Sequence, residues 1–435
     1  MPGGDRHGLA VGDEVEVDVT AVAHGGHCVA RHEGQVLFVR HAIPGERVLA
    51  RVTETGAGDR FVRADAVTVL TASADRVEPP CPWAGPGRCG GCDLQHVALA
   101  RQRELKADVV HEQLARLAHL DVDVVVEPVP GDVGGLDWRT RVEFAVDSDG
   151  RAGLRRHRSH DVVPVDHCRI AAPGVDALGV TTRTWPGVEL VDTVSPSVGE
   201  ALAVPVPGEV PVVRERVVAS WRSADGGERR FDHEFAVSAR GFWQVHPGAA
   251  ATFLAAVMEA VDARSGERAL DLYAGVGLFA TALAEAVGPT GQVLAVESDP
   301  GATAHARDNL AALGNVVVVP ARVDDAFGVP RPARRGSARQ RGSRPRKASR
   351  STLLPTSADV VVLDPPRTGA GRGVCVEVAA LGPRVVAYVA CDPAALARDT
   401  AYLSDAGYRL DRLAAFDAFP MTHHVECVAR FVPGP

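Results

Sequence analysis

A cysteine and a glutamate near the carboxyl end of the chain have side chains that could together carry out covalent chemistry. Cys391 follows an apolar run typical of a buried strand, and Glu426 comes 35 residues later, just after a pair of histidines. A thiolate is a nucleophile, and a carboxylate can accept a proton. The two residue types therefore indicate a nucleophile and a base, if the fold brings them together. For Cys391, an inert buried thiol stays open as an alternative. For Glu426, the alternatives are a solvated carboxylate at a strand end and an ion pair with Arg430.

The segments upstream of this pair are typical of a sheet that binds a nucleotide. Gly275 and Gly277 lie between a strand and a helix, and Glu297 ends the next strand 22 residues after Gly275. Asp364 closes a later strand, ahead of two prolines that keep the chain out of helix. Ligands of open α/β sheets bind at the carboxyl ends of the strands, so these residues are predicted to hold a cofactor there. The glycine pattern matches both NAD enzymes and enzymes that use S-adenosylmethionine.

From about residue 245 onward, helix and strand patterns alternate, which predicts a parallel sheet. The expected helices span residues 248–262, 278–287, 300–313, 374–381 and 394–406. The expected strands span residues 268–273, 292–298, 315–320, 358–364 and 384–391, followed by a hairpin of 408–416 and 424–432. If the last strand runs antiparallel to the others, it begins where they end. Glu426 then reaches the same edge as Cys391 and Asp364.

A basic segment interrupts this alternation. Residues 331–351 contain nine Lys or Arg and no acidic residue. The surrounding stretch, 328–357, lacks apolar periodicity and is predicted to form a disordered loop. It could be a solvated linker or an electrostatic tether for an RNA backbone.

Four further cysteines are candidates for a metal site. They are Cys81, Cys89, Cys92 and Cys168. Four thiolates suit a [4Fe-4S] cluster or a tetrahedral zinc ion, and the spacing does not decide between them. No metal is expected at His423 and His424, because neighbouring residues of a strand point to opposite faces. The remaining cysteines are assigned to packing: Cys28, Cys375 and Cys427.

The first half of the chain is predicted to form two β-rich units. Residues 11–70 alternate apolar and polar positions in short runs, which is typical of half-buried strands in a small barrel. An amphipathic helix is expected over residues 98–120, followed by strands and turns over 124–235. We therefore predict three domains, over residues 1–72, 73–238 and 239–435.

Basic residues gather around one tryptophan in the middle unit. They could form an ordinary charged strand face or a groove that follows RNA phosphates. The residues are Trp138, Arg139, Arg141, Arg151, Arg155, Arg156 and Arg158.

Length and composition limit the classes of protein to consider. A chain of 435 residues should form roughly two to four domains. A net charge of −8 argues against a uniformly basic surface, so any RNA contact should be local. Eight cysteines are too sparse for a disulfide scaffold. No stretch approaches the ~18 apolar residues of a membrane span, so we expect a cytoplasmic protein that does not bind membranes. A monomer is also expected.

Four motifs together resemble those of the RNA uracil-C5 methyltransferases, the enzymes that make 5-methyluridine. They are Asp271-Leu-Tyr-Ala-Gly-Val-Gly-Leu-Phe279, Asp364-Pro-Pro-Arg-Thr-Gly369, Tyr388-Val-Ala-Cys-Asp-Pro-Ala-Ala-Leu-Ala-Arg-Asp399 and Phe419-Pro-Met-Thr-His-His-Val-Glu-Cys-Val428. The N-terminal segment resembles a TRAM domain, an OB-like RNA-binding barrel. The cysteine set resembles the iron-sulfur centre of the branch that modifies 23S ribosomal RNA. This likeness spans almost the whole chain and implies an α/β fold. The barrel would be N-terminal, a β-rich domain would be central, and a class I, Rossmann-like methyltransferase sheet would be C-terminal.

The resemblance also implies a role for each candidate residue. Cys391 would add to C6 of a uracil, which makes C5 nucleophilic, and Glu426 would remove the C5 proton after methylation. S-adenosylmethionine would be the methyl donor, and the four candidate cysteines would hold a [4Fe-4S] cluster. The residues expected at the cofactor are Gln244, Tyr273, Gly275, Gly277, Glu297 and Asp364. Ribosomal RNA is the expected substrate, with transfer RNA as the alternative.

The chain departs from the family pattern at two places. Leu278 stands where an asparagine is frequent, and seven residues separate Cys81 from Cys89 where five are usual. Two other functions stay open. One is an amino-methyltransferase, because Asp-Pro-Pro also resembles enzymes that methylate exocyclic nitrogens and need no thiol. The other is a non-catalytic RNA-binding or redox-sensing iron-sulfur protein on a methyltransferase fold.

Overall fold

A closed five-stranded barrel forms the N-terminal unit of the structure, a computed structural model that describes residues 8–56, 61–330 and 350–435. The strand order is β1-β2-β3-β5-β4. Alternate side chains point inward, and branched apolar residues such as Leu37 and Val48 fill the interior. This confirms the predicted small barrel. The strands are β1 (Glu14–Ala23), β2 (His27–His32), β3 (Gln35–Arg40), β4 (Arg47–Thr55) and β5 (Val62–Thr71).

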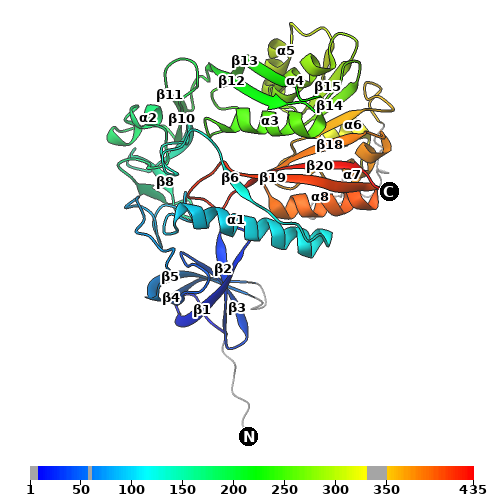
Figure 1. Ribbon diagram of the computed structural model, residues 1–435. Coiled ribbons are helices and arrows are strands. Elements are labelled where there is room, and N and C mark those ends of the chain that lie inside the picture. The colour runs from blue at the N-terminus through cyan, green and yellow to red at the C-terminus, as the bar shows by residue number, and fades with distance from the viewer. Residues whose placement is uncertain (1–7, 57–60, 331–349) are drawn as a thin grey trace, which may run out of the picture.

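A long helix lies between the barrel and the C-terminal sheet (Figure 1). It consists of α1 (Leu99–Gln113) and a π-helical turn, η2 (Leu114–Ala118), inside the range predicted for a helix. Its buried face carries apolar residues such as Leu105, but also Gln102 and Lys106. Buried polar side chains need hydrogen-bond partners. Here the loop over residues 418–425, near the carboxyl end of the chain, supplies partners for both.

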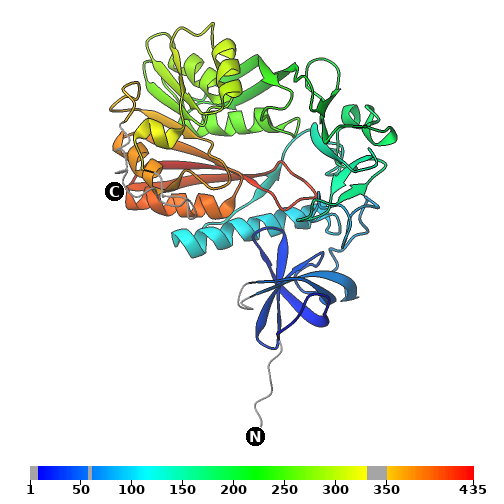
Figure 2. The same ribbon diagram turned by 180° about the vertical axis from the view of Figure 1, so that it is seen from behind.

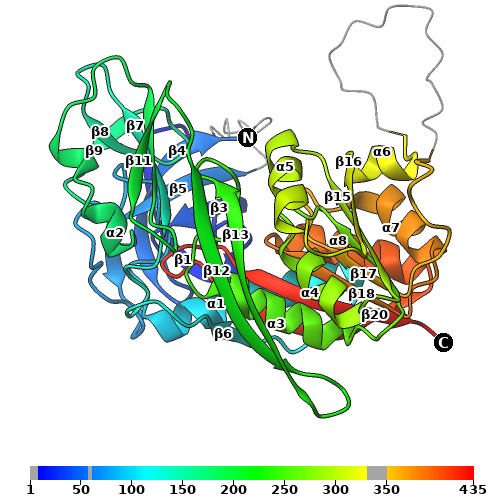
Figure 3. The ribbon, with the colours of Figure 1, turned by 90° about the horizontal axis from the view of Figure 1, so that it is seen from above.

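The middle of the chain forms a five-stranded antiparallel sheet and a separate long hairpin. The sheet has the order β11-β10-β7-β8-β9, and the hairpin joins β12 to β13. One face of the hairpin packs on α3 (Ala249–Val261) and α5 (Pro300–Asn309), and Figure 3 shows it as two long green strands beside α3. The elements are β7 (Arg141–Val146), β8 (Ala152–Arg155), β9 (Val162–Pro164), α2 (Pro173–Asp176), η3 (Val180–Thr182), β10 (Leu190–Val194), β11 (Leu202–Val206), β12 (Val212–Arg222) and β13 (Glu228–Ser238).

Five of the six arginines in the cluster around Trp138 pair with acidic side chains, whereas Arg139 donates to the carbonyl of Arg141. Arg141 donates to Glu215 over 2.9 Å, and both side chains are largely buried. The other pairs are Arg151–Asp147, Arg155–Glu143, Arg156–Asp161 and Arg158–Glu54. Trp138 is only 1% exposed and cannot stack on a base. Of the two interpretations of this cluster, the geometry favours the ordinary charged strand face over the phosphate groove.

An eight-stranded sheet forms the C-terminal unit, in the order β16-β15-β14-β17-β18-β20-β19-β6. The strands from β16 to β18 run parallel, whereas β20 is antiparallel to both β18 and β19. Helices α3, α4 and α5 pack on one face, and α1, α6, α7 and α8 on the other. This confirms the predicted α/β fold.

The elements of this unit lie close to their predicted ranges. The strands are β14 (Arg268–Leu272), β15 (Gln292–Glu297), β16 (Val316–Pro320), β17 (Val360–Leu363), β18 (Val385–Ala390), β19 (Tyr408–Asp417) and β20 (Glu426–Pro433). The helices are α3 (Ala249–Val261), α4 (Leu278–Val287), α5 (Pro300–Asn309), α6 (Val323–Phe327), α7 (Gly371–Ala380) and α8 (Pro393–Asp405). Seen from behind, the loop between β19 and β20 extends from the sheet to the middle unit (Figure 2).

Two segments differ from the prediction. β6 (Val126–Pro128) pairs with β19 and so belongs to the C-terminal sheet, although it lies in the part of the chain assigned to the middle unit. The predicted disordered loop over 328–357 falls mainly outside the described residues, but the prediction is wrong for its C-terminal end. Leu354 is 6% exposed in the core, and Arg350 pairs with Glu377.

Candidate active site

Four candidate side chains and one further carboxyl group, that of Asp271, lie along one edge of the C-terminal sheet. Glu297 ends β15, Asp271 lies near the end of β14, and Asp364 follows β17. Cys391 follows β18, and Glu426 begins β20. Because β15, β14, β17, β18 and β20 are consecutive neighbours, the glycine turn and the two candidate catalytic residues lie on either side of Asp364.

The register of the last strands sets Cys391 and Glu426 opposite each other. In the antiparallel pair of β18 and β20, Ala390 pairs with Cys427, so the next residues face each other across the two strands. Directly opposite residues of an antiparallel pair point their side chains to the same face. The strand register therefore places Cys391 and Glu426 together at one edge of the sheet, whereas their roles as nucleophile and base stay predictions.

The charges at this edge interact strongly. Burial raises the pKa of Cys391 to about 12; the carboxylates of Glu426 and Asp364 add to the rise, and Arg367 opposes it. Burial also raises the pKa of Glu426 well above its usual range, with Asp364 adding to the rise and Arg367 opposing it. Arg430 pairs with Asp411, so the alternative of a Glu426–Arg430 ion pair is wrong.

A cavity of about 190 Å³ opens at Cys391. Its walls come from three parts of the chain that are far apart in sequence: the turn between β1 and β2, helix α1, and the loops at the sheet edge. The lining residues include Val22, His24, Gly26, Lys106, Arg367, Cys391, Asp392, His423 and His424. The contribution of the barrel to this cavity was not predicted.

The glycine turn is built around Glu297. One of its carboxylate oxygens accepts from the Gly275 amide at 2.9 Å, and the other accepts from the amides of Ser298 and Asp299. Gly275 and Gly277 have φ values of 56° and 96°, a region that suits glycine. These contacts place the Glu297 carboxylate at the turn, as the cofactor prediction requires.

Asn309 is a residue of this turn that sequence reasoning missed. Its amide donates to the carbonyl of Val276 at 3.0 Å and to that of Ala236 at 3.1 Å. It therefore joins the glycine turn to β13. Gln244, by contrast, lies in the loop between β13 and α3 with no side-chain hydrogen bond to another described residue. Its predicted contact with the cofactor stays a prediction.

Asp271 is a second residue that was not singled out. It is fully buried, and neither of its carboxylate oxygens has a hydrogen-bond partner within the described ranges. Burial raises its pKa to about 8; the nearby Ala280 amide opposes the rise, and the charges of Asp364 and Glu297 add to it. An acidic residue inside the apolar run of β14 was the signal that could have revealed it.

The buried carboxyl of Asp271 gives the stability of the protein a specific pH dependence. Its folded pKa lies far above its ordinary value of 3.8, so between about pH 4 and pH 8 the folded state binds a proton that the unfolded state has lost. This contribution to stability is full at low pH and disappears as the pH rises through 8. Asp271→Asn does not titrate, so the Tm of the variant minus that of the wild type should become more positive from pH 5 to pH 8.5 in thermal melts. A difference that stays constant would show that Asp271 does not titrate in this way.

The turn that follows Asp364 is fixed by Asp399 of α8. Its carboxylate accepts from the amide of Ala370 at 2.6 Å and from the hydroxyl of Tyr388 at 2.5 Å. It also accepts from the Gly371 amide. Asp399 is the last residue of one of the four family motifs, but it was not predicted as a site residue. Its hydrogen bonds hold the turn that carries Arg367.

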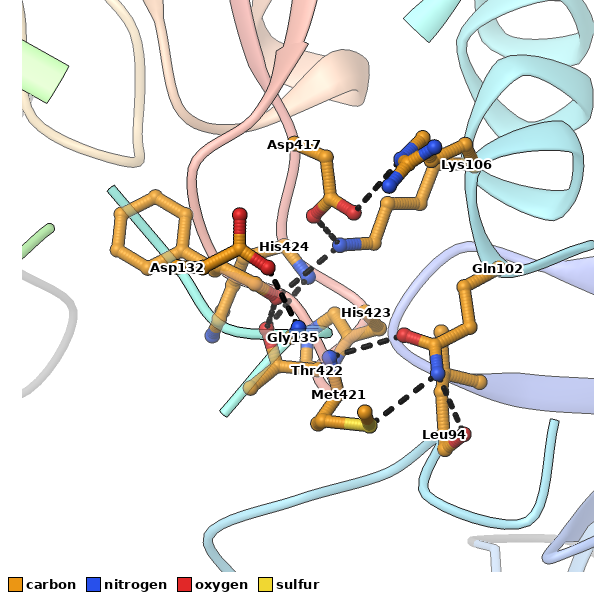
Figure 4. A network of polar contacts seen from close by, with 12 residues as sticks. Leu94, Gln102, Lys106, Asp132, Gly135, Asp417, Met421, Thr422, His423 and His424 are labelled. Carbon is orange, nitrogen blue, oxygen red and sulfur yellow. Dashed lines mark hydrogen bonds and ion pairs between the residues drawn. The ribbon is translucent and has the colours of Figure 1, made fainter. Parts of the chain in front are cut away.

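The loop that leads into Glu426 is held by α1 and by the segment after Cys92 (Figure 4). Gln102 accepts from the Met421 amide at 2.9 Å, and Lys106 donates to the Phe419 carbonyl at 3.0 Å. His423 Nδ1 lies 2.6 Å from the carboxylate of Asp93. The prediction that His423 and His424 point to opposite faces is wrong: both precede β20, and their ring centroids lie 4.1 Å apart.

The ion pair of Lys106 with Asp417 should contribute strongly to stability, because each side chain is only 1% exposed. Lys106→Met would leave a buried carboxylate whose remaining cation, Arg103, lies 3.6 Å away. We expect a loss of about 3 kcal/mol in the free energy of unfolding, the lower end for a broken buried pair, as measured by urea denaturation. Arg101→Ala, which removes a more exposed cation from the same helix, should cost less than about 1 kcal/mol. Equal losses in the two variants would contradict the buried pair.

The four candidate metal ligands lie near one another. Burial raises the pKa of Cys89 to about 11; the Gly91 amide, which donates to its sulfur at 3.4 Å, opposes the rise, and Cys168 and Cys81 add to it. Cys92 interacts with Cys168 in the same way, and both pack around Trp138 and Met421. Yet within the described ranges no group of three or more His, Cys, Asp or Glu side chains is arranged to hold a single metal ion. The cysteines assigned to packing, Cys28, Cys375 and Cys427, are all buried in apolar clusters.

Comparisons with known proteins place the chain among RNA-modifying enzymes. A family model described as tRNA (uracil-5-)-methyltransferase matches residues 227–431, and the TRAM domain matches residues 9–67. An RNA methyltransferase of Streptomyces coelicolor is 50% identical over 451 residues, which cover 97% of this chain and 93% of that protein. The 23S rRNA (uracil(1939)-C(5))-methyltransferase RlmD of Shewanella amazonensis is 30% identical, over 96% of this chain and 95% of that protein.

One solved structure matches nearly the whole fold. It is the tRNA (uracil-54, C5)-methyltransferase of Pyrococcus abyssi in complex with S-adenosyl-L-homocysteine, with a TM-score of 0.63 and 22% identity. The match covers 96% of this chain and 99% of that chain. None of the helices in the described ranges combines the length and apolar character that crossing a bilayer requires.

Proposed function

Because this chain belongs to the family of S-adenosylmethionine-dependent RNA (uracil-5-)-methyltransferases, we propose that it methylates C5 of a uridine in RNA with Cys391 as the nucleophile and Glu426 as the base. The observation that carries the proposal is the strand register that sets these two residues opposite each other, beside Asp364. Neither rival function requires a thiol and a carboxylate to meet at the sheet edge.

The chemistry assigned to each residue follows from its place. The thiolate of Cys391 forms a bond to C6, and the electron pair of the C5–C6 double bond moves towards C5 and O4. Bound S-adenosylmethionine supplies the methyl group that C5 then takes. The carboxylate of Glu426 removes the C5 proton, the double bond forms again, and the bond from C6 to sulfur breaks. Cys391 leaves as a thiolate and Glu426 keeps the C5 proton, so the site is restored once that proton passes to solvent.

The cofactor would lie on the other side of Asp364 from Cys391. Gly275, Gly277 and Glu297 form the turn that can receive a nucleoside, and Tyr273 begins it with a φ of 68°. We also assign Gln244 to this site, on the resemblance alone. Burial raises the pKa of Asp364 to about 7, which makes its charge sensitive to a cationic ligand.

We propose ribosomal RNA as the substrate. Support comes from the name of the Shewanella relative, from the TRAM domain and from the set of four cysteines. Transfer RNA is the second candidate, because the matching family model carries that name. The target base would have to leave its stack, since the cavity at Cys391 lies between the barrel and the sheet. A cytoplasmic location and a monomeric state remain predictions.

Mapping of 5-methyluridine in cellular RNA, with and without this gene, tests the proposal. We expect one or a few sites to disappear from 23S ribosomal RNA when the gene is deleted. Loss only from transfer RNA would select the second candidate. Loss of an N-methylated base instead would select the amino-methyltransferase. An unchanged map, together with no calorimetric binding of S-adenosylmethionine, would favour a non-catalytic protein.

We also propose that Cys81, Cys89, Cys92 and Cys168 hold a [4Fe-4S] cluster. The thiols lie close enough for their charges to interact, but not in the compact arrangement that a single ion needs. A cluster of four irons is larger than one ion, so its thiolates stand farther apart. Such a cluster would tie the segment after Cys92 to the middle unit. Brown colour and iron in anaerobically purified protein, both lost in Cys168→Ser, are expected; a colourless protein that contains zinc would contradict the proposal.

A further inference from the structure

The barrel touches the candidate active site through the turn between β1 and β2. His24 Nε2, in that turn, lies 2.9 Å from Oδ2 of Asp392, the neighbour of Cys391 in the chain. Two residues on, Gly26 lies so near the His423 side chain that an added Cβ would come within 3.0 Å of the His423 Cβ and 3.1 Å of its ring. The barrel therefore contacts both segments that carry the proposed catalytic residues.

Asp392 connects His24 to the position of Cys391. Its other carboxylate oxygen, Oδ1, accepts from the Ala395 amide at 2.7 Å and so caps the first turn of α8. With one oxygen on the helix and one on His24, the side chain has a single orientation. The backbone that carries Cys391 is then fixed from two sides, by the helix and by the barrel.

A second contact between the barrel and the sheet edge runs through Asp93. Arg40, at the end of β3, donates to one oxygen of Asp93 at 3.1 Å, and His423 Nδ1 lies 2.6 Å from the other. Both Arg40 and Asp93 are buried. This contact fixes how the barrel docks, independently of His24, so the barrel should stay in place when His24 is replaced.

On the basis of the proposed function, we propose that His24 is a positioning residue for Cys391 and that the turn at residues 22–26 is the barrel's wall of the pocket that receives the target uracil. The turn supplies the side of the cavity nearest Asp392. A nucleophile displaced by about 1 Å can lose on the order of 10²-fold in rate. His24 thus acts through Asp392, and it need not contact the reacting atoms.

The proposed role can be separated from a role in folding. The side chain of His24 is 39% exposed, and its removal leaves Asp392 with its helix contact. Exposed ion pairs contribute little to stability, so His24→Ala should shift the Tm by less than about 3 °C. His24→Gln keeps a donor that can reach Asp392 and serves as the conservative variant.

The test measures how fast a covalent adduct forms with RNA that contains 5-fluorouridine. Fluorine at C5 cannot leave as a proton, so elimination stops and the bond from sulfur to C6 persists. With S-adenosylmethionine and saturating transcript of 23S ribosomal RNA or transfer RNA, whichever the wild type methylates, we expect His24→Ala to slow adduct formation about 10- to 100-fold. Its Kd for the RNA should stay within about threefold, and His24→Gln should recover most of the rate. Arg51→Ala, which removes an ion pair with Glu14 elsewhere on the barrel, should leave the rate unchanged.

Each other outcome has a definite meaning. A wild-type rate for His24→Ala at saturating RNA would overturn the positioning role while leaving the proposed function intact. Weakened RNA binding with an unchanged rate would also overturn it, and would assign His24 to gripping RNA. Failure of His24→Gln to recover the rate would exclude the contact with Asp392 as the cause. If the wild type itself forms no adduct with either RNA, the proposed function fails, and this inference fails with it.

Discussion

Replacing Cys391 by alanine is expected to lower methyl transfer to RNA by at least about 10⁴-fold, the scale of losing a nucleophile that acts through a covalent intermediate. C5 of uracil is too electron-poor to take a methyl group until a thiolate adds at C6. No other thiol replaces Cys391 at the cavity, because Cys427, in the neighbouring strand, is fully buried. Transfer of labelled methyl from S-adenosylmethionine to RNA measures the loss.

The control for this variant is Cys375→Ala, which removes a buried thiol from α7 of the same unit. It should retain turnover within a few fold, although it will cost some stability. Binding of S-adenosylmethionine to Cys391→Ala should stay near the wild-type value, because the glycine turn lies on the other side of Asp364. An active Cys391→Ala would exclude covalent catalysis and would favour the amino-methyltransferase.

The surroundings of this thiol favour its protonated form when the site is free. Burial raises the pKa of Cys391 to about 12, and two of its neighbours, Glu426 and Asp364, are acidic. Arg367 is the cation that opposes this effect. The thiol should therefore become reactive mainly when the cationic S-adenosylmethionine and the substrate are bound. This dependence limits side reactions of the free thiol.

The sequence predicted the C-terminal sheet well because its signals are local. Strand and helix periods alternate there, and Gly275, Gly277 and the prolines after Asp364 mark the turns. The place of β6 in this sheet escaped prediction because β6 is a strand of only three residues that pairs with β19. Such a pairing joins residues almost three hundred positions apart, and no local pattern encodes it.

The candidate site was predicted only where a residue type carries chemistry by itself. Cys391, Glu426 and Asp364 have that property, and the antiparallel last strand brought them together as expected. His24 and Asp93 could not be predicted in this way, because an isolated histidine or aspartate in a turn is usually a solvated surface residue. Their importance arises from the docking of the barrel on the sheet edge, which only three-dimensional contacts reveal.

Glu426→Gln is expected to produce the opposite failure from Cys391→Ala: a covalent protein–RNA adduct that accumulates. Glutamine has nearly the same shape but cannot accept the C5 proton, so addition and methylation proceed while elimination stalls. Removal of a general base typically slows its step by about 10²- to 10⁴-fold. Glu426 is 6% exposed, and its raised pKa makes the ionised carboxylate a strong base. The adduct should appear as a slow band in denaturing gels.

Two further variants separate this explanation from others. Glu285→Gln changes a carboxylate of α4 that pairs with His233, and it should behave like the wild type. The double variant Cys391→Ala/Glu426→Gln should form no adduct, because the bond to RNA requires the thiol. Free, fully methylated product from Glu426→Gln would exclude Glu426 as the base. Asp364, the acidic neighbour of both residues, would then be the next candidate, since its pKa of about 7 allows it to exchange a proton near neutral pH.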